Sequence, residues 1–312
     1  MNYRGGVQMQ KKRYTLKYLL SKYQLFVMLL PALTALIVFA YIPMYGVIIA
    51  FQNFNTLHGI WGSEFIGLTH FRDFFTSAMF GVTFTNTLLL SFYSILWGFP
   101  IPIIFALLLN QLRFKKFKRF VQTVSYAPFF ISTVVLVSML NLFLAPQTGF
   151  INHILNIFGL DSINFMFRAE WFRTVFISSE IWQTMGWSAI IYLAALSNIS
   201  PDLYEASTID GASKFQRILY IDIPSIMPTV VILLILRMGS LMSVGFERVL
   251  LMQQGMNIMT SEIIATYVYK LGLLGAQHSL AAAIGLFNSA INFILLITFN
   301  SIMKKISGSG LF

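Results

Sequence analysis

The sequence predicts an all-α membrane protein with six transmembrane helices and with both termini in the cytoplasm. Three observations support this fold class. Hydrophobic residues make up 57% of the 312 residues and charged residues only 10%, whereas soluble domains carry about 25% charged residues. Apolar runs of the roughly 20 residues that cross a bilayer recur along the chain. Basic residues gather in alternate connections between those runs, which is the pattern that orients membrane proteins.

The six apolar runs set the expected helices and the division of the chain. The helices are expected at 25–50, 82–109, 123–145, 172–196, 226–248 and 280–302. The first run continues to Phe51, well beyond the ~7–15-residue apolar core of a signal peptide, so we expect an uncleaved span. The chain then divides into a basic cytoplasmic segment 1–24, a transmembrane domain 25–302 and a cytoplasmic tail 303–312.

The distribution of basic residues predicts the orientation of the spans. Fifteen of the 21 lysines and arginines fall in residues 1–22, 110–122, 197–224 and the C-terminal tail. Five fall in the three opposite connections, and Arg237 lies inside the fifth span. By the positive-inside rule the richer set faces the cytoplasm. The net charge of +10 therefore reflects membrane topology, and no nucleic-acid partner is expected.

Several classes of site are not expected. The chain has no cysteine, which excludes disulfides, thiol nucleophiles and thiolate metal sites. The four histidines fall in predicted loops, one or two in each and far apart in sequence, so we predict no metal site and no catalytic residues. The outer stretches FIGLTHFRDFF and GFINHILNIFGL mix aromatic and spaced aliphatic residues, and we expect short helices there at the outer membrane interface.

The loop 197–224 carries the most informative pattern of the chain. Ser200 is a suitable N-cap and Pro201 fits the first helical position, while Gly211 is suited to the left-handed residue that ends a helix. A short helix is therefore expected over 201–210. An amphipathic helix on the inner membrane surface should follow it, with Pro224 and Pro228 turning the chain into the fifth span. A simple capped connector remains the alternative interpretation.

The same loop resembles a known family. Inner-membrane permeases of binding-protein-dependent ABC importers carry E-A-A, three residues, G, nine residues and then I-x-L-P. Here Glu205-Ala206-Ser207 precede Gly211, and nine residues later comes Ile221-Asp222-Ile223-Pro224. Ser207 and Ile223 depart from the consensus with residues of similar size. The stretches FIGLTHFRDFF, MSVGFERVLLM and SEIIATYVYKLG are similar to the polysaccharide and complex-sugar branch of this family.

The resemblance implies a type I ABC importer permease in a bacterial cell membrane. The loop would hold a coupling helix that docks in a groove of a cytoplasmic ATPase, and Glu205 would contact the ATPase or cap the helix that does. The implied coupling residues are Glu205, Ala206, Ser207, Asp210, Gly211 and Pro224.

The resemblance also implies the partners. An ATPase dimer would bind ATP and Mg²⁺, because this chain has no phosphate-binding G-x-x-x-x-G-K-[ST] loop and is expected to hold no cofactor. A second permease, identical or, as we favour, homologous so that the pair is a heterodimer, would complete the pathway. An extracellular sugar-binding protein would deliver the substrate, and lipid surrounds the spans.

Polar residues inside the spans are the candidates for the substrate pathway. Amides and carboxylates bind sugar hydroxyls, and aromatic rings stack on sugar faces. Arg237 either meets an anionic sugar such as a uronate or pairs with an acidic residue of the bundle. Glu180 and Glu247 are expected near the outer boundary. The candidates are Asn141, Glu180, Trp182, Gln183, Trp187, Tyr192, Arg237, Glu247, Asn288 and Asn292. For each of them, hydrogen bonding between helices is the alternative role.

Two other functions are alternatives. An ion-coupled secondary transporter predicts several titratable residues at the membrane midplane, and only Arg237 fits. A membrane-embedded enzyme needs converging catalytic residues, which the predicted spans lack. We therefore predict a sugar import permease, a transport subunit and not an enzyme.

Overall fold

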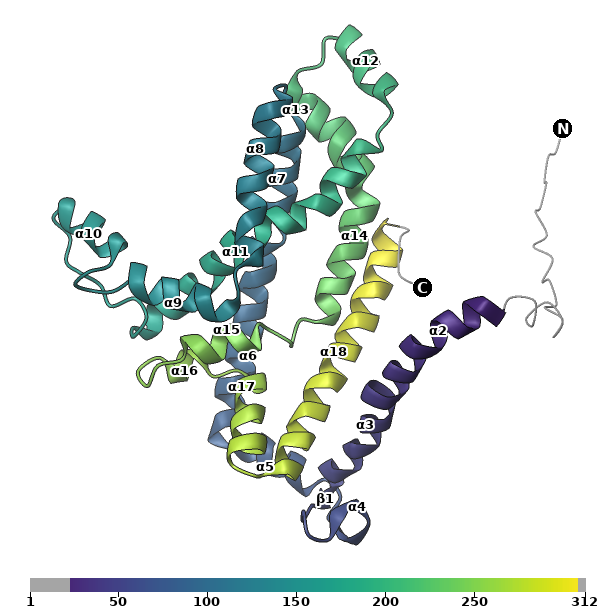
Figure 1. The fold of residues 1–312 in the computed structure, drawn as a ribbon, viewed down its shortest axis with the longest axis vertical. Helices are drawn as coiled ribbons and strands as arrows, with labels where there is room; N and C mark the ends of the chain where they lie inside the picture. Colours follow the sequence, from purple (N-terminus) through teal and green to yellow (C-terminus); the bar gives the residue numbers. More distant parts are fainter. Residues whose placement is uncertain (1–22, 308–312) are drawn as a thin grey trace.

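The computed structural model describes residues 23–307, and these residues are mostly helical (Figure 1). Two short strands, β1 (Gln52–Asn53) and β2 (Glu64–Phe65), pair antiparallel. The predicted segment 1–24 lies almost wholly outside the described residues, as do residues 308–312 of the predicted tail. The helical elements in chain order are α2 (Tyr23–Leu36), η1 (Ile37–Tyr41), α3 (Ile42–Met44), η2 (Tyr45–Phe51), α4 (Gly59–Gly62), α5 (Thr69–Thr76), α6 (Ala78–Gly98), α7 (Pro100–Asn110), α8 (Lys115–Tyr126), η3 (Ala127–Phe130), α9 (Thr133–Phe143), α10 (Phe150–Ile157), α11 (Ala169–Ser197), α12 (Pro201–Ile209), α13 (Lys214–Arg217), η4 (Ile218–Asp222), α14 (Ile223–Gly239), α15 (Phe246–Met252), α16 (Ile258–Ser261), α17 (Ile264–Tyr269), η5 (Lys270–Leu274) and α18 (His278–Ser307).

Four helices of the described chain are long and apolar enough to cross a membrane. They are Tyr23–Phe51, Ala78–Asn110, Lys214–Gly239 and His278–Lys305. A bent pair of helices would make a fifth span. Helix α11 coincides with the predicted span 172–196 and is 29 residues long. It carries more polar side chains than the four helices above and is not among those apolar enough to cross a membrane. The helical extents of the predicted first, second and sixth spans are confirmed, and the count of six remains a prediction.

The predicted third span, 123–145, is not one straight helix. Lys115–Phe130 and Thr133–Phe143 meet at a bend of 101°. Ser132 is extended and its hydroxyl accepts a hydrogen bond from the Val135 N–H at 3.4 Å, so it caps a new helix. The N-cap geometry of Ser132 stops the helix from continuing through this position.

The predicted fifth span, 226–248, begins and ends in the wrong places. The helix starts at Lys214, runs without interruption through α13, η4 and α14, and ends at Gly239. Pro224, directly after the π turn η4, and Pro228, inside α14, both lie within this helix, and neither of them ends it. Non-helical residues 240–245 then lead to α15.

Neighbouring helices satisfy the backbone where α14 ends. The Met242 N–H donates to Asn292 Oδ1 of α18 at 2.8 Å, and the Ser91 hydroxyl of α6 donates to the Leu241 carbonyl. Irregular backbone at membrane depth is tolerated where protein groups pair it in this way.

Three apolar clusters hold the helices together. One is centred on Phe176 of α11 and Val249 of α15, one on Ile226 of α14 and Ala189 of α11, and one on Phe74 of α5 against α17 and α18. These clusters lie between α11 and its neighbours and near the α5 end, so they position the polar residues described below.

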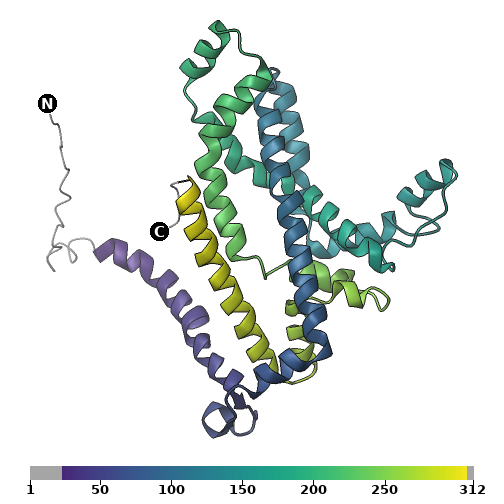
Figure 2. The same ribbon diagram turned by 180° about the vertical axis from the view of Figure 1, so that it is seen from behind.

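The long helices run between two ends of the molecule. Helix α12 projects beyond one end, and α4, β1 and α5 lie at the other (Figure 1). Helix α2 diverges from the bundle in both views (Figure 2), and none of its residues is buried. The stretches FIGLTHFRDFF and GFINHILNIFGL form α5 and α10, so the prediction of short helices there is confirmed.

Candidate functional site

Both ends of α12 are capped as the sequence predicts. The Ser200 hydroxyl accepts a hydrogen bond from the Asp202 N–H at 3.3 Å, and Pro201 occupies the first turn. Gly211 has a φ of 74°. Its N–H donates to the Thr208 carbonyl at 3.1 Å, and the Ala212 N–H donates to the Ser207 carbonyl at 2.9 Å. This pair of bonds is a Schellman ending, which defines the last turn of a nine-residue helix.

The coupling residues inferred from the resemblance lie in and around α12. Glu205, Ala206, Asp210 and Gly211 are exposed, and Ser207 is half-buried with its hydroxyl donating to the Tyr204 carbonyl at 2.8 Å. No residue of α12 is buried. The exposed face of the helix is therefore free for contact with another molecule. Pro224 lies apart from this face, in the first turn of α14.

Asp222, which lies in the family's motif, is a buried residue. The residue is 0% exposed. Its Oδ1 accepts a hydrogen bond from the Tyr204 hydroxyl at 2.5 Å, and its Oδ2 accepts one from Gln111 Nε2 at 2.9 Å. Asp222 therefore joins α12 to the end of α7 and to the helix that continues as α14.

A polar cluster inside the helical bundle joins three helices. Arg237 Nη2, in the last turn of α14, donates to Glu180 Oε1 of α11 at 2.8 Å and to Ser94 Oγ of α6 at 2.7 Å. The Ser94 hydroxyl donates to Glu180 Oε2 at 2.7 Å. Of the two roles open to Arg237, this structure contains the pairing with an acidic residue. Glu180 is not a solvated residue, because its side chain is only 19% exposed and pairs with Arg237.

A second arginine lies behind this cluster. Arg248 of α15 is buried, its Nη2 donates to Gln183 Oε1, and its guanidinium lies 5.7 Å from the centre of the Phe176 ring. Gln183 Nε2 in turn donates to the Ile131 carbonyl at 2.7 Å. Arg248 thus bonds to a neutral amide, whereas Glu180 forms its ion pair with Arg237.

Arg237 and Glu180 also line a cavity of about 550 Å³. Trp187 and Tyr192 of α11 line it too, and the Trp187 ring stacks on Phe129 with the centroids 4.5 Å apart and the planes at 3°. A smaller space of about 50 Å³, lined mainly by serines and glycine of α6 and residues 240–245, adjoins the same ion pair. The Arg237 side chain is 46% exposed, so its remaining donors can reach a molecule in the cavity.

Several candidate pathway residues are not brought to this cavity. Trp182 is exposed on another face of α11, and Asn141 is exposed on α9, beyond the bend. Glu247 begins α15 and is exposed, so it does not share a helix with Arg237 as expected. Asn292 bonds the Met242 N–H and Ser243, and Asn288 Oδ1 is buried without a hydrogen-bond partner in the described chain.

Some residues that build the cluster were not among the candidates from the sequence. Ser91 and Ser94 are buried on α6, and Arg248 is buried on α15. The signal for the serines was available, because Thr83, Thr87 and Ser91 recur every four residues and lie on one helix face. Arg248 could not be assigned from the sequence, since its burial depends on the early end of α14.

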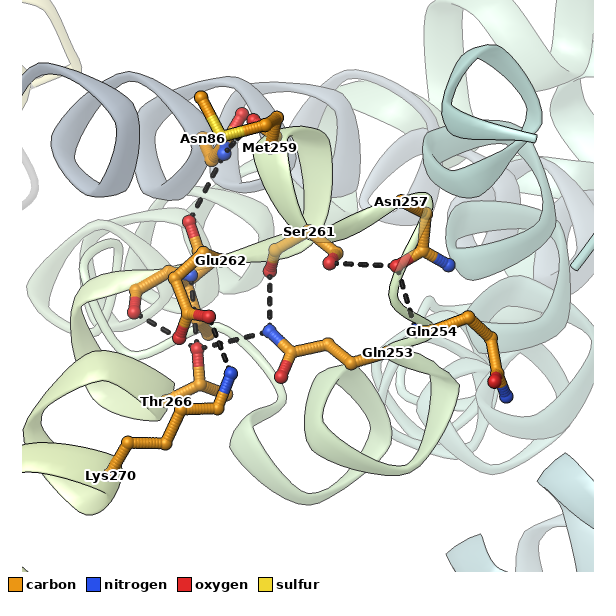
Figure 3. A network of polar contacts seen from close by, with 10 residues as sticks. Asn86, Gln253, Gln254, Asn257, Met259, Ser261, Glu262, Thr266 and Lys270 are labelled. Carbon is orange, nitrogen blue, oxygen red and sulfur yellow. Dashed lines mark hydrogen bonds and ion pairs between the residues drawn. The ribbon is translucent and has the colours of Figure 1, made fainter. Parts of the chain in front are cut away.

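A separate polar network fixes the segment between α15 and α17 (Figure 3). Asn257 bonds the Met166 carbonyl at 2.9 Å and the Ser261 hydroxyl at 3.0 Å. Asn86 of α6 bonds the Glu262 carbonyl at 3.1 Å, and the buried Glu262 side chain pairs with Lys270 at 2.5 Å. The network fixes this segment, in which α16 makes only a single helical turn. Within residues 23–307, no group of three or more His, Cys, Asp or Glu side chains is arranged to hold a metal ion.

Three comparisons relate the chain to known proteins. The family described as "Binding-protein-dependent transport system inner membrane component" matches residues 74–308. The polygalacturonan/rhamnogalacturonan transport system permease protein YteP of Bacillus subtilis is 41% identical over 303 residues, which cover 97% of this chain and 94% of that protein. Protein LplB of the same organism is 40% identical over 92% of this chain and 91% of its own length.

A solved structure has a similar fold over nearly the whole chain. It is a chain of a bacterial alginate ABC transporter in complex with an alginate pentasaccharide-bound periplasmic protein. The TM-score is 0.88 at 38% identity, and the match covers 96% of this chain and 100% of that one.

Proposed function

The chain belongs to the family of binding-protein-dependent transport system inner membrane components, and we propose that it forms half of the translocation pathway of an ATP-driven importer of acidic oligosaccharides. As a member of this family it is a multi-pass transport subunit of the cell membrane and not an enzyme. The proposal concerns its coupling site, its partners and its substrate.

One observation carries the coupling role, namely the isolated and doubly capped helix α12. It bears the family's motif from Glu205 to Gly211, contains no buried residue and projects beyond the bundle (Figure 1). A short helix with fixed ends transmits a displacement, whereas a frayed helix absorbs it. We assign Glu205, Ala206, Ser207 and Asp210 to the surface that docks on a cytoplasmic ATPase dimer, which would bind the ATP and Mg²⁺.

The exposed first helix supports a second membrane subunit. Helix α2 carries large apolar side chains that are exposed along its length, including Leu25, Met28 and Leu30. A helix that is apolar all round needs lipid or protein around it. A second, homologous permease would cover part of this helix and supply the other half of the pathway, and lipid would cover the remainder. An extracellular binding protein would present the sugar at the α5 end.

The cavity supports an anionic substrate. Arg237 is half-exposed in the cavity, and the buried Arg248 bonds to the neutral amide of Gln183. A charge in the low-dielectric interior of a membrane protein is costly unless an opposite charge pairs with it. A uronate carboxylate in the cavity would supply a further opposite charge, and the Trp187 ring offers a flat face for a sugar ring. Two similar proteins, named above, serve polygalacturonan and alginate, which are acidic polysaccharides.

Uptake by the assembled transporter in proteoliposomes tests this function. The chain is co-expressed with its genomic neighbours, and the complex that purifies with it is reconstituted. Uptake of labelled oligogalacturonate is then compared with that of its carboxyl-reduced, neutral counterpart. We expect Arg237→Met to reduce uptake of the acidic sugar by roughly tenfold, the value of one charge-assisted hydrogen bond, and Arg237→Lys to retain part of it.

Arg168→Met is the matched control, because it removes one exposed positive charge outside the cavity. Equal uptake of acidic and reduced sugar by the wild type, or unchanged acidic uptake in Arg237→Met, would reject the acidic substrate. Uptake by this chain without an ATPase would reject the importer itself.

A further inference from the structure

The orientation of α12 raises a physical question. None of its residues is buried, so apolar packing does not hold it against the transmembrane helices. A helix that transmits force must nevertheless be joined to the element it moves. In α12 this connection is made by polar contacts, and the shortest of them ends on Asp222.

The Asp222 carboxylate is bonded on both oxygens. The Tyr204 hydroxyl of α12 donates to one oxygen at 2.5 Å, and Gln111 Nε2, at the end of α7, donates to the other at 2.9 Å. Hydrogen bonds to an ionised group are roughly twice as strong as neutral ones. Their strength increases further where water is excluded, and Asp222 is fully buried.

The backbone is irregular at this point. Asp222 is the last residue of the π-helical turn η4, and the Ile223 N–H bonds to the Ile218 carbonyl, five residues back. Each residue of an α-helix turns the chain by about 100°. The helix starts at the capping box of Ser213 and Gln216. Compared with an uninterrupted α-helix, the additional residue of the π turn therefore changes the direction of Asp222 around the helix axis by about that angle. Such turns recur at functional positions.

We propose that the Tyr204–Asp222–Gln111 tie is the mechanical link that carries a displacement of α12 into α14, with Asp222 as the positioning residue. This inference rests on the proposed coupling role of α12. From Asp222 the helix continues to Arg237, about 22 Å further along its axis at 1.5 Å per residue. A displacement that enters at Asp222 thus reaches the Arg237–Glu180 pair beside the cavity. The tie connects the ATPase side to the substrate side through one continuous helix.

The protonation of Tyr204 agrees with this role. Burial, together with the bond to Asp222, raises the pKa of Tyr204 to about 12. The phenol is therefore protonated at neutral pH and donates its proton to the carboxylate throughout the physiological range.

Transport per ATP hydrolysed in the whole reconstituted complex tests the link. We expect Asp222→Leu and Tyr204→Phe to lower the number of sugars moved per ATP by about tenfold or more, comparable to the loss of a hydrogen bond to a charged group. Asp222→Asn should remain within about twofold of the wild type. Its amide oxygen still accepts from Tyr204, and the Gln111 amide can rotate to present its oxygen.

A second readout follows the position of α12 directly. Since the chain has no cysteine, Ile209 and Leu236 can be replaced by cysteine and spin-labelled in a background that retains uptake. The inter-label distance distribution should broaden in Asp222→Leu and stay narrow in Asp222→Asn. Tyr220→Phe is the control, because Tyr220 lies in the same turn η4 as Asp222, is 72% exposed and takes no part in the tie.

The double variant Tyr204→Phe/Asp222→Leu decides whether the two residues act together. If they form one link, the double variant transports no worse per ATP than Asp222→Leu alone, since contacting residues are not additive. Unchanged transport per ATP in Tyr204→Phe, or additive losses, would overturn the proposal. If Asp222→Leu fails to assemble, transport per ATP in Tyr204→Phe still tests the link, because this variant removes only a single oxygen. Normal ATPase stimulation after disruption of α12 at Gly211 would instead reject the coupling role of α12.

Discussion

Replacing Gly211 with valine tests whether α12 must end sharply. Gly211 has a φ of 74°, and no atom lies within 4 Å of where a Cβ would be added. The cost of a side chain is therefore backbone strain and not a clash. A non-glycine residue pays about 1–2 kcal/mol in this left-handed region, and a β-branched residue pays at least that much.

The strain acts on the two bonds that close α12. The Gly211 and Ala212 N–H groups donate to carbonyls of the last turn at 3.1 and 2.9 Å. A cost of about 1–2 kcal/mol shifts the equilibrium between closed and open last turn by roughly 5- to 30-fold. The effect stays local because α12 has no buried residue. Membrane insertion and the stability of the bundle should therefore be unchanged.

Hydrogen–deuterium exchange and ATPase stimulation measure the two consequences. In Gly211→Val, the exchange rate of the last-turn amides of α12 should rise by roughly 5- to 30-fold. Sugar-stimulated ATP hydrolysis should be lost. Gly211→Asn should be mild, because asparagine tolerates this conformation. Gly159→Val is the matched control, since Gly159 has a φ of 75° after the unrelated helix α10. Unchanged exchange in Gly211→Val would refute the local reasoning, and faster exchange with normal stimulation would refute the coupling role.

Two further predictions concern helix packing. Gly186→Ala should lower the melting temperature of the detergent-solubilised protein by the equivalent of about 1–3 kcal/mol, because its Cβ would lie 2.1 Å from the Ser125 carbonyl oxygen. Gly81→Ala is the control and should leave the melting temperature unchanged, because there is open space around Gly81. Equal melting temperatures would mean that α8 yields at no cost. Asn292→Leu should destabilise by about 1–3 kcal/mol, since it leaves the Met242 N–H unpaired, whereas Asn288→Leu, one turn away, should be neutral or stabilising because its Oδ1 has no partner in the described chain. Urea or thermal unfolding in detergent measures both, and an equal loss in the two variants would contradict the assigned role of Asn292.

The fold was predictable where a few neighbouring residues determine it. Apolar length predicted the helices at 25–50, 82–109 and 280–302, and Ser200 with Gly211 predicted the limits of α12 to within one residue. These features depend on hydropathy over one span or on a cap and its next few residues.

The prediction failed where a local signal competed with apolar composition. The run 123–145 is apolar throughout, yet Ser132 caps a new helix and bends the chain by 101°. The run 226–248 is also apolar, yet the helix ends at Gly239, where Asn292 and Ser91 pair the open backbone. Hydropathy does not register such endings, because it averages over the residues that cause them.

Taken alone, the sequence determined that the chain is a membrane protein, where helix α12 begins and ends, and which family it resembles. The tertiary structure decided which polar residues meet. Glu180 finds Arg237 57 residues away, and Asp222 finds Gln111 111 residues away. A cap depends on adjacent residues, but the partner of a buried charge depends on how separate helices cross, and helix crossing is fixed by the packing of all of them together.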